Sequence, residues 1–292
     1  MADPKISLAS FASIFLGACA AASDGTLHFG WLAATLIGIF AIEIAKNASG
    51  EIFDWNSGND QAVMPEDRSP FSGGKRVLVD KLLTKRQTAG IALAGYAIGS
   101  ITGLIILLKR EPSVLWLGII GIALAFFYHA PPLKLSYRGM GELAVAASYG
   151  PLIGTGTYLV QRGTVSSAII SVAALLGVFI AAFLIINEFP DFHADQAAGK
   201  RTLVVLLGRK PASRLFVAII AVAFLLIALL PPLLQFSPAP WLGLIAVVPA
   251  FSASKRLLAN PETTAQIIPA QANALLTFML FALGSGVGFL LS

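Results

Sequence analysis

Long apolar runs separated by shorter polar stretches make up most of this chain. About 20 consecutive apolar residues are needed for a helix to cross the hydrocarbon core of a bilayer. Because backbone in lipid must satisfy its hydrogen bonds internally, each such run is expected to be a helix. The pattern predicts an all-α polytopic membrane protein with nine transmembrane helices, the first and eighth being short, at residues 8–22, 29–48, 88–108, 114–129, 141–161, 166–186, 212–234, 239–253 and 270–291.

The basic residues between these runs predict the orientation of the chain. If the N-terminus is cytoplasmic, nearly all Lys and Arg residues outside the helices, from Lys5 to Arg256, fall on the cytoplasmic side. The opposite side then carries only Lys109, Arg110 and Arg162. Cytoplasmic loops are enriched in Lys and Arg. We therefore expect a bacterial or archaeal cytoplasmic membrane protein with its N-terminus inside and its C-terminus outside.

The first run has a second interpretation, as a signal peptide. Lys5 precedes an apolar segment, and Leu16-Gly17-Ala18-Cys19 resembles a lipoprotein cleavage box. Cleavage would leave the predicted orientation of the other helices unchanged. Since the chain begins at Met1, we expect the run to be retained as a helix.

Composition supports the membrane class. Only 12% of residues are charged and the mean hydropathy is +0.80, whereas soluble domains carry about 25% charged residues. The net charge of +5 would suggest nucleic acid in a soluble protein, but basic cytoplasmic loops explain it here, so no nucleic-acid partner is expected. The single Cys19 excludes an intrachain disulfide and a Cys-based zinc site.

The first candidate site is the stretch 47–60, which ends the second apolar run. Asn47, Glu51 and Asp54 are spaced i, i+4, i+7 and would share one helical face, with Asp60 close behind. Oxygen ligands without Cys or His suit Mg²⁺ rather than Zn²⁺. The alternative is a solvated loop just outside a membrane helix.

A second acidic stretch follows the sixth run. Asn187, Asp191 and Asp195 are spaced i, i+4, i+8 and would line one helical face, although a helix should bend or begin at Pro190. Both acidic stretches fall on the predicted cytoplasmic side. Mg²⁺ is commonly held by one or two carboxylates plus substrate phosphates. We therefore expect the two stretches to face each other, with a polyanionic ligand completing the metal shells.

Basic residues accompany both acidic stretches. Arg68 and Lys75 flank a Ser-Gly-Gly turn whose N–H groups could point at an anion, and Lys200 follows Gly199. The alternative is that these residues only set the topology. The charge alternation of residues 77–83 suits a short interfacial helix.

A third segment follows the fourth run. Pro131-Pro132 fixes an extended turn that could aim Tyr128 inward and Lys134 towards a phosphate, with Arg138 nearby. Tyr128 could instead be an interfacial belt residue.

Glu43 and Lys46 lie within the second run, where ionisable residues are costly and usually functional or paired. Lys46 could balance the neighbouring carboxylates when metal is absent. Alternatively, both side chains could extend to the cytoplasmic interface.

Taken together, these stretches resemble the UbiA superfamily of intramembrane prenyltransferases. The resemblance rests on the motifs Asn47-x2-Gly50-Glu51-x2-Asp54-x3-Gly58-x-Asp60 and Asn187-x3-Asp191-x3-Asp195-x3-Gly199-Lys200-x-Thr202-Leu203. The spacing is most similar to the menaquinone branch, which prenylates 1,4-dihydroxy-2-naphthoate. The chain departs from the family in having Gly50-Glu51 for Asn-Asp and Pro190 for Arg, and in lacking an N-terminal Arg-Pro element, which leaves the aromatic acceptor open.

The resemblance implies one domain over residues 1–292, with helices in a ring around a central cavity and loops at about 49–87 and 187–210 as a cytoplasmic cap. It implies an isoprenyl diphosphate and an aromatic acceptor as substrates, Mg²⁺ as cofactor, and Asp54, Asp191 and Tyr128 as catalytic residues, with Asp191 taking a proton from the acceptor. The implied Mg²⁺ ligands are Glu51, Asp54, Asp60, Asn187, Asp191 and Asp195. The implied substrate-binding residues are Asn47, Arg68, Lys75, Lys134, Arg138 and Lys200.

Two other functions are compatible with the sequence. Another activity of the same superfamily would use a different acceptor, or would cyclise a terpene without one. A cation transporter or channel would use the acidic residues as an ion path, but no matching acidic set occurs on the predicted outer side.

Overall fold

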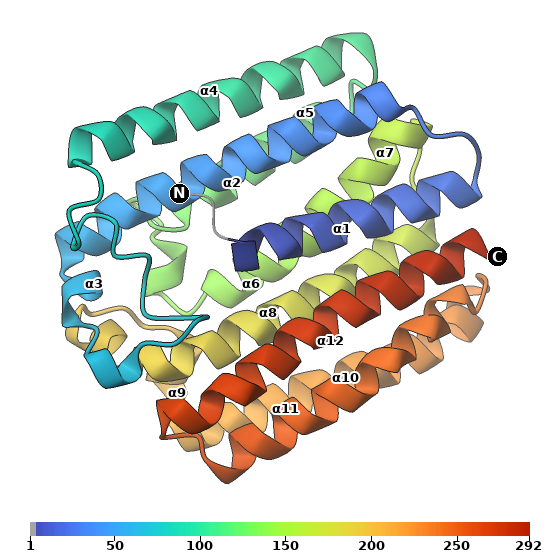
Figure 1. Cartoon of the computed structure of the whole chain (residues 1–292). Helices are drawn as coiled ribbons and strands as arrows, with labels where there is room; N and C mark the ends of the chain where they lie inside the picture. Colours follow the sequence, from blue (N-terminus) through green and yellow to red (C-terminus); the bar gives the residue numbers. More distant parts are fainter. Residues whose placement is uncertain (1–3) are drawn as a thin grey trace.

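A computed structural model describes residues 4–292, except for the side chains of residues 4–6 and 239. Lys5, which contributes to the predicted charge asymmetry, lies among those exceptions. The described chain consists of helices joined by turns (Figure 1). In order they are α1 Pro4–Ser23, α2 Phe29–Ser57, α3 Asn59–Ala62, η1 Pro65–Asp67, α4 Lys85–Lys109, α5 Val114–Phe127, η2 Leu135–Tyr137, α6 Gly141–Ala147, η3 Ser148–Thr155, α7 Gly156–Arg162, α8 Ser167–Ala197, α9 Leu203–Leu207, α10 Arg209–Leu234, η4 Ala239–Ala246, α11 Val247–Ala259 and α12 Thr264–Leu290.

Among the residues that the structure describes, seven helical segments are long and apolar enough to cross a membrane, so the expected number of nine is corrected. These segments are Phe29–Ser57, Lys85–Lys109, Gly141–Arg162, Ser167–Ala197, Arg209–Leu234, Pro240–Ala259 and Thr264–Leu290. The remaining two expected spans correspond to shorter apolar helices, Ser7–Ser23 and Val114–Phe127. At 1.5 Å per residue, a helix the length of α5 extends only about 21 Å, less than the hydrocarbon core of about 30 Å.

Helix α8 is the centre of the packing. It contacts α6, η3, α10 and α12 and is the most buried of the candidate spans. Its aromatic rings pack on α12, where Phe179 lies 4.9 Å from Phe281 and Phe183 lies 5.4 Å from Phe278, centroid to centroid. A helix that is apolar on all sides is stable only when other helices surround it, which explains its central position.

Two facing glycines let α8 approach η3 closely. A Cβ built on Gly150 would lie 2.8 Å from the Cα of Gly177, and one built on Gly177 would lie 3.0 Å from the Cα of Gly150. Real Cβ atoms do not come this close to a backbone. The absence of side chains at these two positions therefore sets the distance between the two helices.

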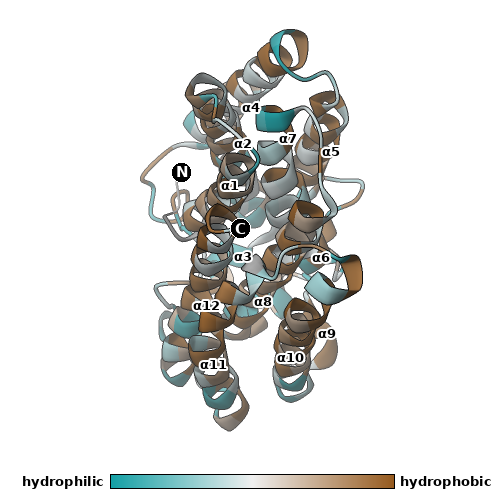
Figure 2. Cartoon of the chain, turned by 90° about the vertical axis from the view of Figure 1, so that its right-hand side faces the viewer, coloured by the Kyte–Doolittle hydropathy of each residue, from teal (hydrophilic) through white to brown (hydrophobic). Residues whose placement is uncertain are grey.

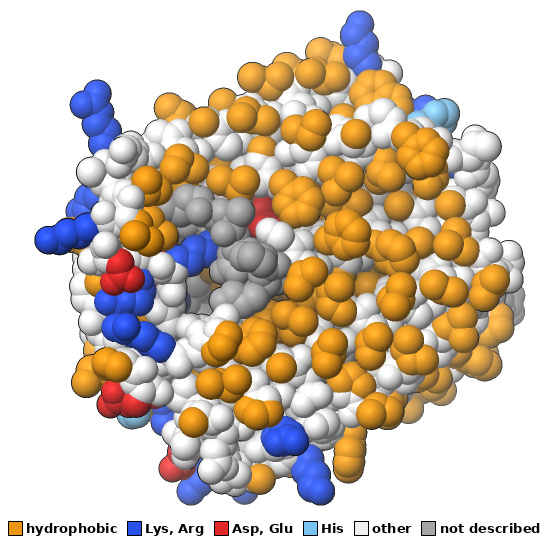
Figure 3. Space-filling view, in the orientation of Figure 1, with side chains coloured by type: hydrophobic (Ala, Val, Ile, Leu, Met, Phe, Trp, Pro, Cys, Tyr) orange, Lys and Arg blue, Asp and Glu red, His pale blue; other side chains and the backbone are white. Residues whose placement is uncertain are grey.

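The outer helices present apolar surface. Helix α4 packs against α2, and its other side exposes Leu93, Ile101, Leu104 and Leu108. Hydrophobic residues cover the outer faces of the helices in Figure 2, and they cover most of the face shown in Figure 3. Contiguous apolar surface of this extent indicates contact with lipid.

Most charged side chains on the face shown in Figure 3 gather at the end of the bundle that carries α3 and α9. Both acidic stretches lie there because α2 continues to Ser57 and α8 continues to Ala197, beyond the apolar runs that begin them. Helix α8 runs through Pro190 without ending. The segment 77–83 forms turns instead of the predicted interfacial helix, because Lys81 adopts a positive φ of 55°.

The glycine contact can be tested by adding one methyl group. Gly177→Ala should destabilise the protein by about 1–3 kcal/mol in a core that cannot expand freely, because the new Cβ would overlap the carbonyl oxygen of Ala146 in α6 and would lie 3.0 Å from the Cα of Gly150 in η3. The matched control is Gly90→Ala in α4, where a Cβ meets no atom within 4 Å and should leave stability unchanged or raise it slightly. Thermal unfolding of detergent-purified protein measures both; equal stability of the two variants would contradict the proposed close packing.

Candidate active site

A polar cavity of about 340 Å³ lies between the polar ends of α2 and α8. It brings together most of the residues that the sequence singled out, namely Asn47, Glu51, Asp54, Asp60, Lys75, Tyr128, Asn187, Asp191, Asp195 and Lys200. Arg68, Lys134 and Arg138 do not line it, and their side chains are exposed. The two acidic stretches therefore share one cavity, whereas three of the predicted basic residues lie outside it.

On the α2 side, each acidic residue is held by a neighbouring loop. Glu51 Oε1 accepts a hydrogen bond of 3.0 Å from the backbone N–H of Leu78. Asp54 Oδ1 accepts a hydrogen bond of 3.0 Å from the hydroxyl of Tyr137. Burial raises the pKa of Tyr137 to about 12, so its hydroxyl keeps the proton that it donates. These bonds fix the two carboxylates at the cavity wall.

Asp60 lies in the short helix α3 and lines the polar cavity. It is buried, and a Cβ on Gly74 would lie only 2.5 Å from its Oδ1, so only glycine leaves room for the carboxylate there. Burial, followed by the negative charges of Asp54 and Glu51, raises the pKa of Asp60 to about 7. The raised pKa of Asp60 reflects its burial first, and second the negative charge that this cavity concentrates.

His129 contributes to the site although the sequence analysis gave it no role. Its Nε2 lies 3.6 Å from Asp54 Oδ2, and burial lowers its pKa to about 3. The imidazole is therefore neutral and contacts Asp54 without forming an ion pair. A Cβ on Gly50 would lie 2.6 Å from the His129 ring. Because that ring packs directly on Gly50, the glycine that departs from the family motif has a structural reason.

On the α8 side, the surroundings of Asn187, Asp191 and Asp195 differ. Asn187 Oδ1 accepts a hydrogen bond of 3.0 Å from Gln271 of α12. Asp191 Oδ1 is buried and has no hydrogen-bond partner among the described residues. Asp195, 2% exposed, lies 3.5 Å from the Nζ of Lys200. One buried carboxylate oxygen is thus left without a donor among the described residues, and a second carboxylate is matched by an ammonium group.

Lys200 supplies positive charge inside the acidic cavity. Gly199 adopts a positive φ of 70°, and the Lys200 N–H donates to the Asp195 carbonyl at 2.8 Å, so the chain folds back onto the end of α8. Burial lowers the pKa of Lys200, but the charges of Asp195 and Asp54 outweigh it and raise that pKa well above its ordinary value. Lys200 therefore remains charged and partly neutralises the cluster.

Two further buried carboxyl groups line the cavity, Glu142 and Glu188. Glu142 Oε1 accepts a hydrogen bond of 2.8 Å from the N–H of Leu203, which ties α6 to the start of α9. The sequence analysis passed over both residues. An ionisable residue inside or beside an apolar run, as both are, was the signal that could have found them.

The donor set fits Mg²⁺. The ligand atoms that the cavity offers on its acidic side are carboxylate and amide oxygens, the type that Mg²⁺ prefers, and Asp191 Oδ1 is a buried oxygen without a donor. Among the described residues, however, no group of three or more His, Cys, Asp or Glu side chains forms a ready-made metal site. The carboxylates would therefore need oxygens from a ligand to complete a metal shell.

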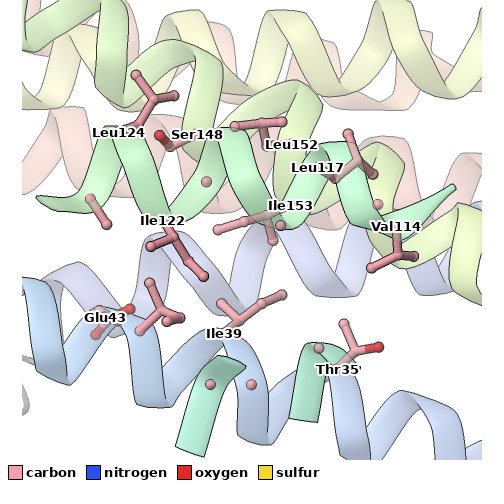
Figure 4. Close-up of a pocket in the computed structure, with 18 of the residues that line it drawn as sticks. Thr35, Ile39, Glu43, Val114, Leu117, Ile122, Leu124, Ser148, Leu152 and Ile153 are labelled. Atoms are coloured by element: carbon pink, nitrogen blue, oxygen red, sulfur yellow. The ribbon is translucent and has the colours of Figure 1, made fainter. Parts of the chain in front are cut away.

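A second cavity, of about 370 Å³, adjoins the polar one and has a mostly aliphatic wall. Figure 4 shows part of this wall, with Ile39 on α2 and with Ile122 and Leu117 on α5. Lys46, Tyr128, Val145 and Tyr149 line both cavities and mark where they meet. At this junction the Nζ of Lys46 lies 5.0 Å from the centroid of the Tyr128 ring, so the sequence-based alternative of an outward-extended Lys46 is not what the structure has.

Comparison with protein families and curated sequences gives consistent matches. A model of the UbiA prenyltransferase family matches residues 10–277. The 1,4-dihydroxy-2-naphthoate octaprenyltransferase of Bacillus subtilis (strain 168) is 25% identical over 291 residues, which cover 99% of this chain and 90% of the relative. The protein of the same name from Mycobacterium tuberculosis is 30% identical over 216 residues, covering 73% and 70%.

Solved structures share the fold. The apo UbiA homologue from Aeropyrum pernix K1 superposes with a TM-score of 0.74 at 15% identity, covering 97% of this chain and 98% of that one. The UbiA homologue from Archaeoglobus fulgidus bound to GPP and Mg²⁺ has a TM-score of 0.61 at 16% identity, covering 97% of both chains. The fold is therefore that of the UbiA homologues.

Lys200 is predicted to stabilise the ligand-free cavity by balancing its charge. Lys200→Met should lower the melting temperature, because breaking a buried ion pair costs about 3–5 kcal/mol. Added Mg²⁺ should raise the melting temperature of the variant more than that of the wild type. The measurement is thermal unfolding of purified protein with and without Mg²⁺.

The matched control is Lys210→Met. Lys210 also lies 3.5 Å from a carboxylate, that of Glu262, but the two side chains are 73% and 59% exposed, and exposed pairs contribute less than about 1 kcal/mol. If both variants lose equal stability, Lys200 is not the internal counter-ion of the cluster.

Proposed function

The chain belongs to the UbiA prenyltransferase family, and we propose that it transfers an isoprenyl chain from an isoprenyl diphosphate to an aromatic acceptor of the 1,4-dihydroxy-2-naphthoate type. The observation that carries the proposal is the meeting of a polar, carboxylate-lined cavity and an apolar cavity at Lys46 and Tyr128. An isoprenyl diphosphate has the matching division into a charged head and an aliphatic tail. The names of the most similar curated relatives support the acceptor class.

The head group is proposed to bind between the α2 and α8 carboxylates together with Mg²⁺. Asp54, Asp191 and Asp195 would be the main protein ligands, and Asn47, Glu51, Asp60 and Asn187 would assist them. When bound, Mg²⁺ would offset the negative charge that builds up on the departing diphosphate.

Lysine side chains inside the cavity are proposed to bind the diphosphate oxygens. Lys75 and Lys200 both line it, and the ammonium group of Lys200 is already held there by Asp195. Donors placed in advance where charge develops stabilise a transition state without reorganisation. Lys200 would thus favour breakage of the bond between the allylic carbon and the diphosphate oxygen. Substrate binding by Arg68, Lys134 and Arg138, which lie outside the cavity, stays a prediction.

Tyr128 and Asp191 are proposed to complete the transfer. The ring of Tyr128 lies at the cavity junction with an ammonium group at 5.0 Å, so its position suits contact with positive charge; an allylic cation there would be stabilised by the ring. An aromatic carbon of the acceptor attacks the cation and a carbon–carbon bond forms; the ring becomes aromatic again when that carbon loses its hydrogen as a proton or its carboxylate as carbon dioxide, and the ring oxygen is protonated again. Asp191, whose Oδ1 has no donor among the described residues, would take the proton released by the acceptor hydroxyl.

The end of the bundle that carries the cavity is proposed to face the cytoplasm. Lys and Arg residues concentrate in the loops at that end (Figure 3), in agreement with the enrichment of basic residues in cytoplasmic loops. Helix α12 ends at the opposite end (Figure 1), which would place the C-terminus outside. The water-soluble head group would then enter from the cytoplasm while the tail stays at bilayer depth.

Asp54→Asn and Asp191→Asn should each lower the rate of diphosphate release at least about 100-fold, because each removes charge from the proposed head-group site. Diphosphate release from geranylgeranyl diphosphate by purified protein with Mg²⁺ is the measurement. The control is Asp80→Asn, since Asp80 is exposed and pairs with Arg76 at 3.2 Å outside the cavity. Unchanged turnover in both cavity variants would overturn the site assignment.

The acceptor class is tested with a panel of aromatic compounds. Purified wild-type protein, Mg²⁺ and geranylgeranyl diphosphate should yield a prenylated adduct with 1,4-dihydroxy-2-naphthoate, detected by mass spectrometry. An adduct with a hydroxybenzoate alone would assign a different acceptor within the family. A cyclic hydrocarbon formed together with diphosphate, and without any adduct, would replace prenyl transfer by terpene cyclisation.

A further inference from the structure

Glu43 is a buried acidic residue that the proposed reaction does not use. It lies in the membrane-spanning part of α2, is 4% exposed, and lines the apolar cavity. In Figure 4 its carboxylate lies beside the cavity on the same helix as Ile39. An acidic residue inside a membrane span is costly and is usually retained for function. We therefore expect its carboxylate, in a mostly aliphatic wall, to bind a ligand or to be paired with another group of the protein.

The partners within the protein come from α1. Ser7 Oγ donates a hydrogen bond of 2.6 Å to Glu43 Oε1, and Ser10 Oγ donates one to Oε2. Each carboxylate oxygen is thereby oriented by one hydroxyl. A carboxylate can accept about four hydrogen bonds, so two acceptor positions are left after these two bonds. Glu43 is thus a fixed acceptor that can take a further donor from the cavity.

The position of Glu43 restricts what that donor can be. Lys46, which lines both cavities, lies one helical turn further along α2, so Glu43 is on the apolar side of the junction and close to it. An isoprenyl tail has no hydrogen-bond donor, and the diphosphate is an anion that a carboxylate repels. A neutral hydroxyl group on an aromatic ring, on the side of the ring away from any anionic substituent, fits both the oxygen atoms of Glu43 and the surrounding wall.

We infer that Glu43 anchors the aromatic acceptor by accepting a hydrogen bond from one of its ring hydroxyl groups. This inference rests on the proposed function and makes Glu43 a specificity-determining residue. The ring would lie at the junction, next to Tyr128, with its hydroxyl directed to Glu43. An acceptor with a methoxy or an anionic group at that ring position would be disfavoured, because neither can donate to the carboxylate and the anion would also repel it.

The test combines changes in Glu43 with changes in the acceptor. Glu43→Leu removes the two carboxylate oxygens that accept hydrogen bonds. Glu43→Gln keeps the shape of the side chain and is the variant least expected to disturb folding. The acceptors are 1,4-dihydroxy-2-naphthoate and its two mono-methyl ethers, each lacking one hydroxyl donor. KM for each acceptor and KM for geranylgeranyl diphosphate are measured with purified protein and Mg²⁺.

The inference predicts that Glu43→Leu raises KM for the dihydroxy acceptor at least about 10-fold, since a hydrogen bond to a charged group is lost, with a smaller rise in Glu43→Gln. KM for the diphosphate should stay unchanged. For one of the two methyl ethers, wild type and Glu43→Leu should have the same KM. If Glu43 only held α1 against α2, KM would not depend in this way on a single hydroxyl group of the aromatic acceptor.

The matched control is Thr35→Val. Thr35 lies on the same helix, lines the same cavity, and donates its hydroxyl at 2.9 Å to the carbonyl of Trp31, so loss of this hydroxyl should leave KM for the aromatic acceptor unchanged. If Glu43→Leu raises KM for both ethers as much as for the dihydroxy acceptor, or raises KM for the diphosphate equally, the inference is overturned.

Binding of 1,4-dihydroxy-2-naphthoate alone, followed by calorimetry, separates this inference from the proposed function. If the wild type forms no prenylated adduct, the proposed function fails. The inference then still stands if Glu43→Leu binds the compound at least about 10-fold more weakly and Thr35→Val does not. It is overturned if the wild type does not bind the compound or if Glu43→Leu binds it equally well.

Discussion

The concentration of negative charge at one end of an apolar bundle is the constraint on which the site depends. Carboxylates crowded into a low-dielectric cavity repel one another and resist ionisation. The protein offsets this with an internal cation, Lys200, with neutral donors such as Tyr137, and with backbone N–H groups from loops. The remaining unmatched negative charge is what gives the cavity its expected affinity for a divalent cation, and the cation together with the lysine side chains would bind the oxygens of a diphosphate.

Two continuous helices place the charged groups. Helices α2 and α8 run from the apolar part of the bundle into the polar cavity without a break, so the position of each carboxylate is set by packing deep in the bundle. The close contact between Gly150 and Gly177 lies on α8 about four to five turns before Asp191 and Asp195. Rigid helices also hold Tyr128 and Lys46 at the junction, where the charged and apolar cavities meet.

Spacing along the sequence predicted that Asn47, Glu51 and Asp54 share one face of a helix, and in the structure all three lie on α2 and line the polar cavity. Contacts between distant segments could not be predicted in this way. The His129 ring against Gly50 and the amide of Gln271 on Asn187 depend on how helices pack, and no local pattern encodes them. The predicted number of transmembrane spans was wrong for a related reason, because apolar composition does not reveal where a helix ends. Helix α5, for example, ends at Phe127.

The most direct measurement is a structure of the protein with a non-reactive isoprenyl thiodiphosphate and Mn²⁺ in place of Mg²⁺. The account predicts anomalous density for Mn²⁺ between Asp54 and the pair Asp191 and Asp195, with the thiodiphosphate beside Lys200. The tail should pass Tyr128 into the cavity between α2 and α5. A head group bound outside this cavity, or a tail that does not enter the apolar cavity, would contradict the account.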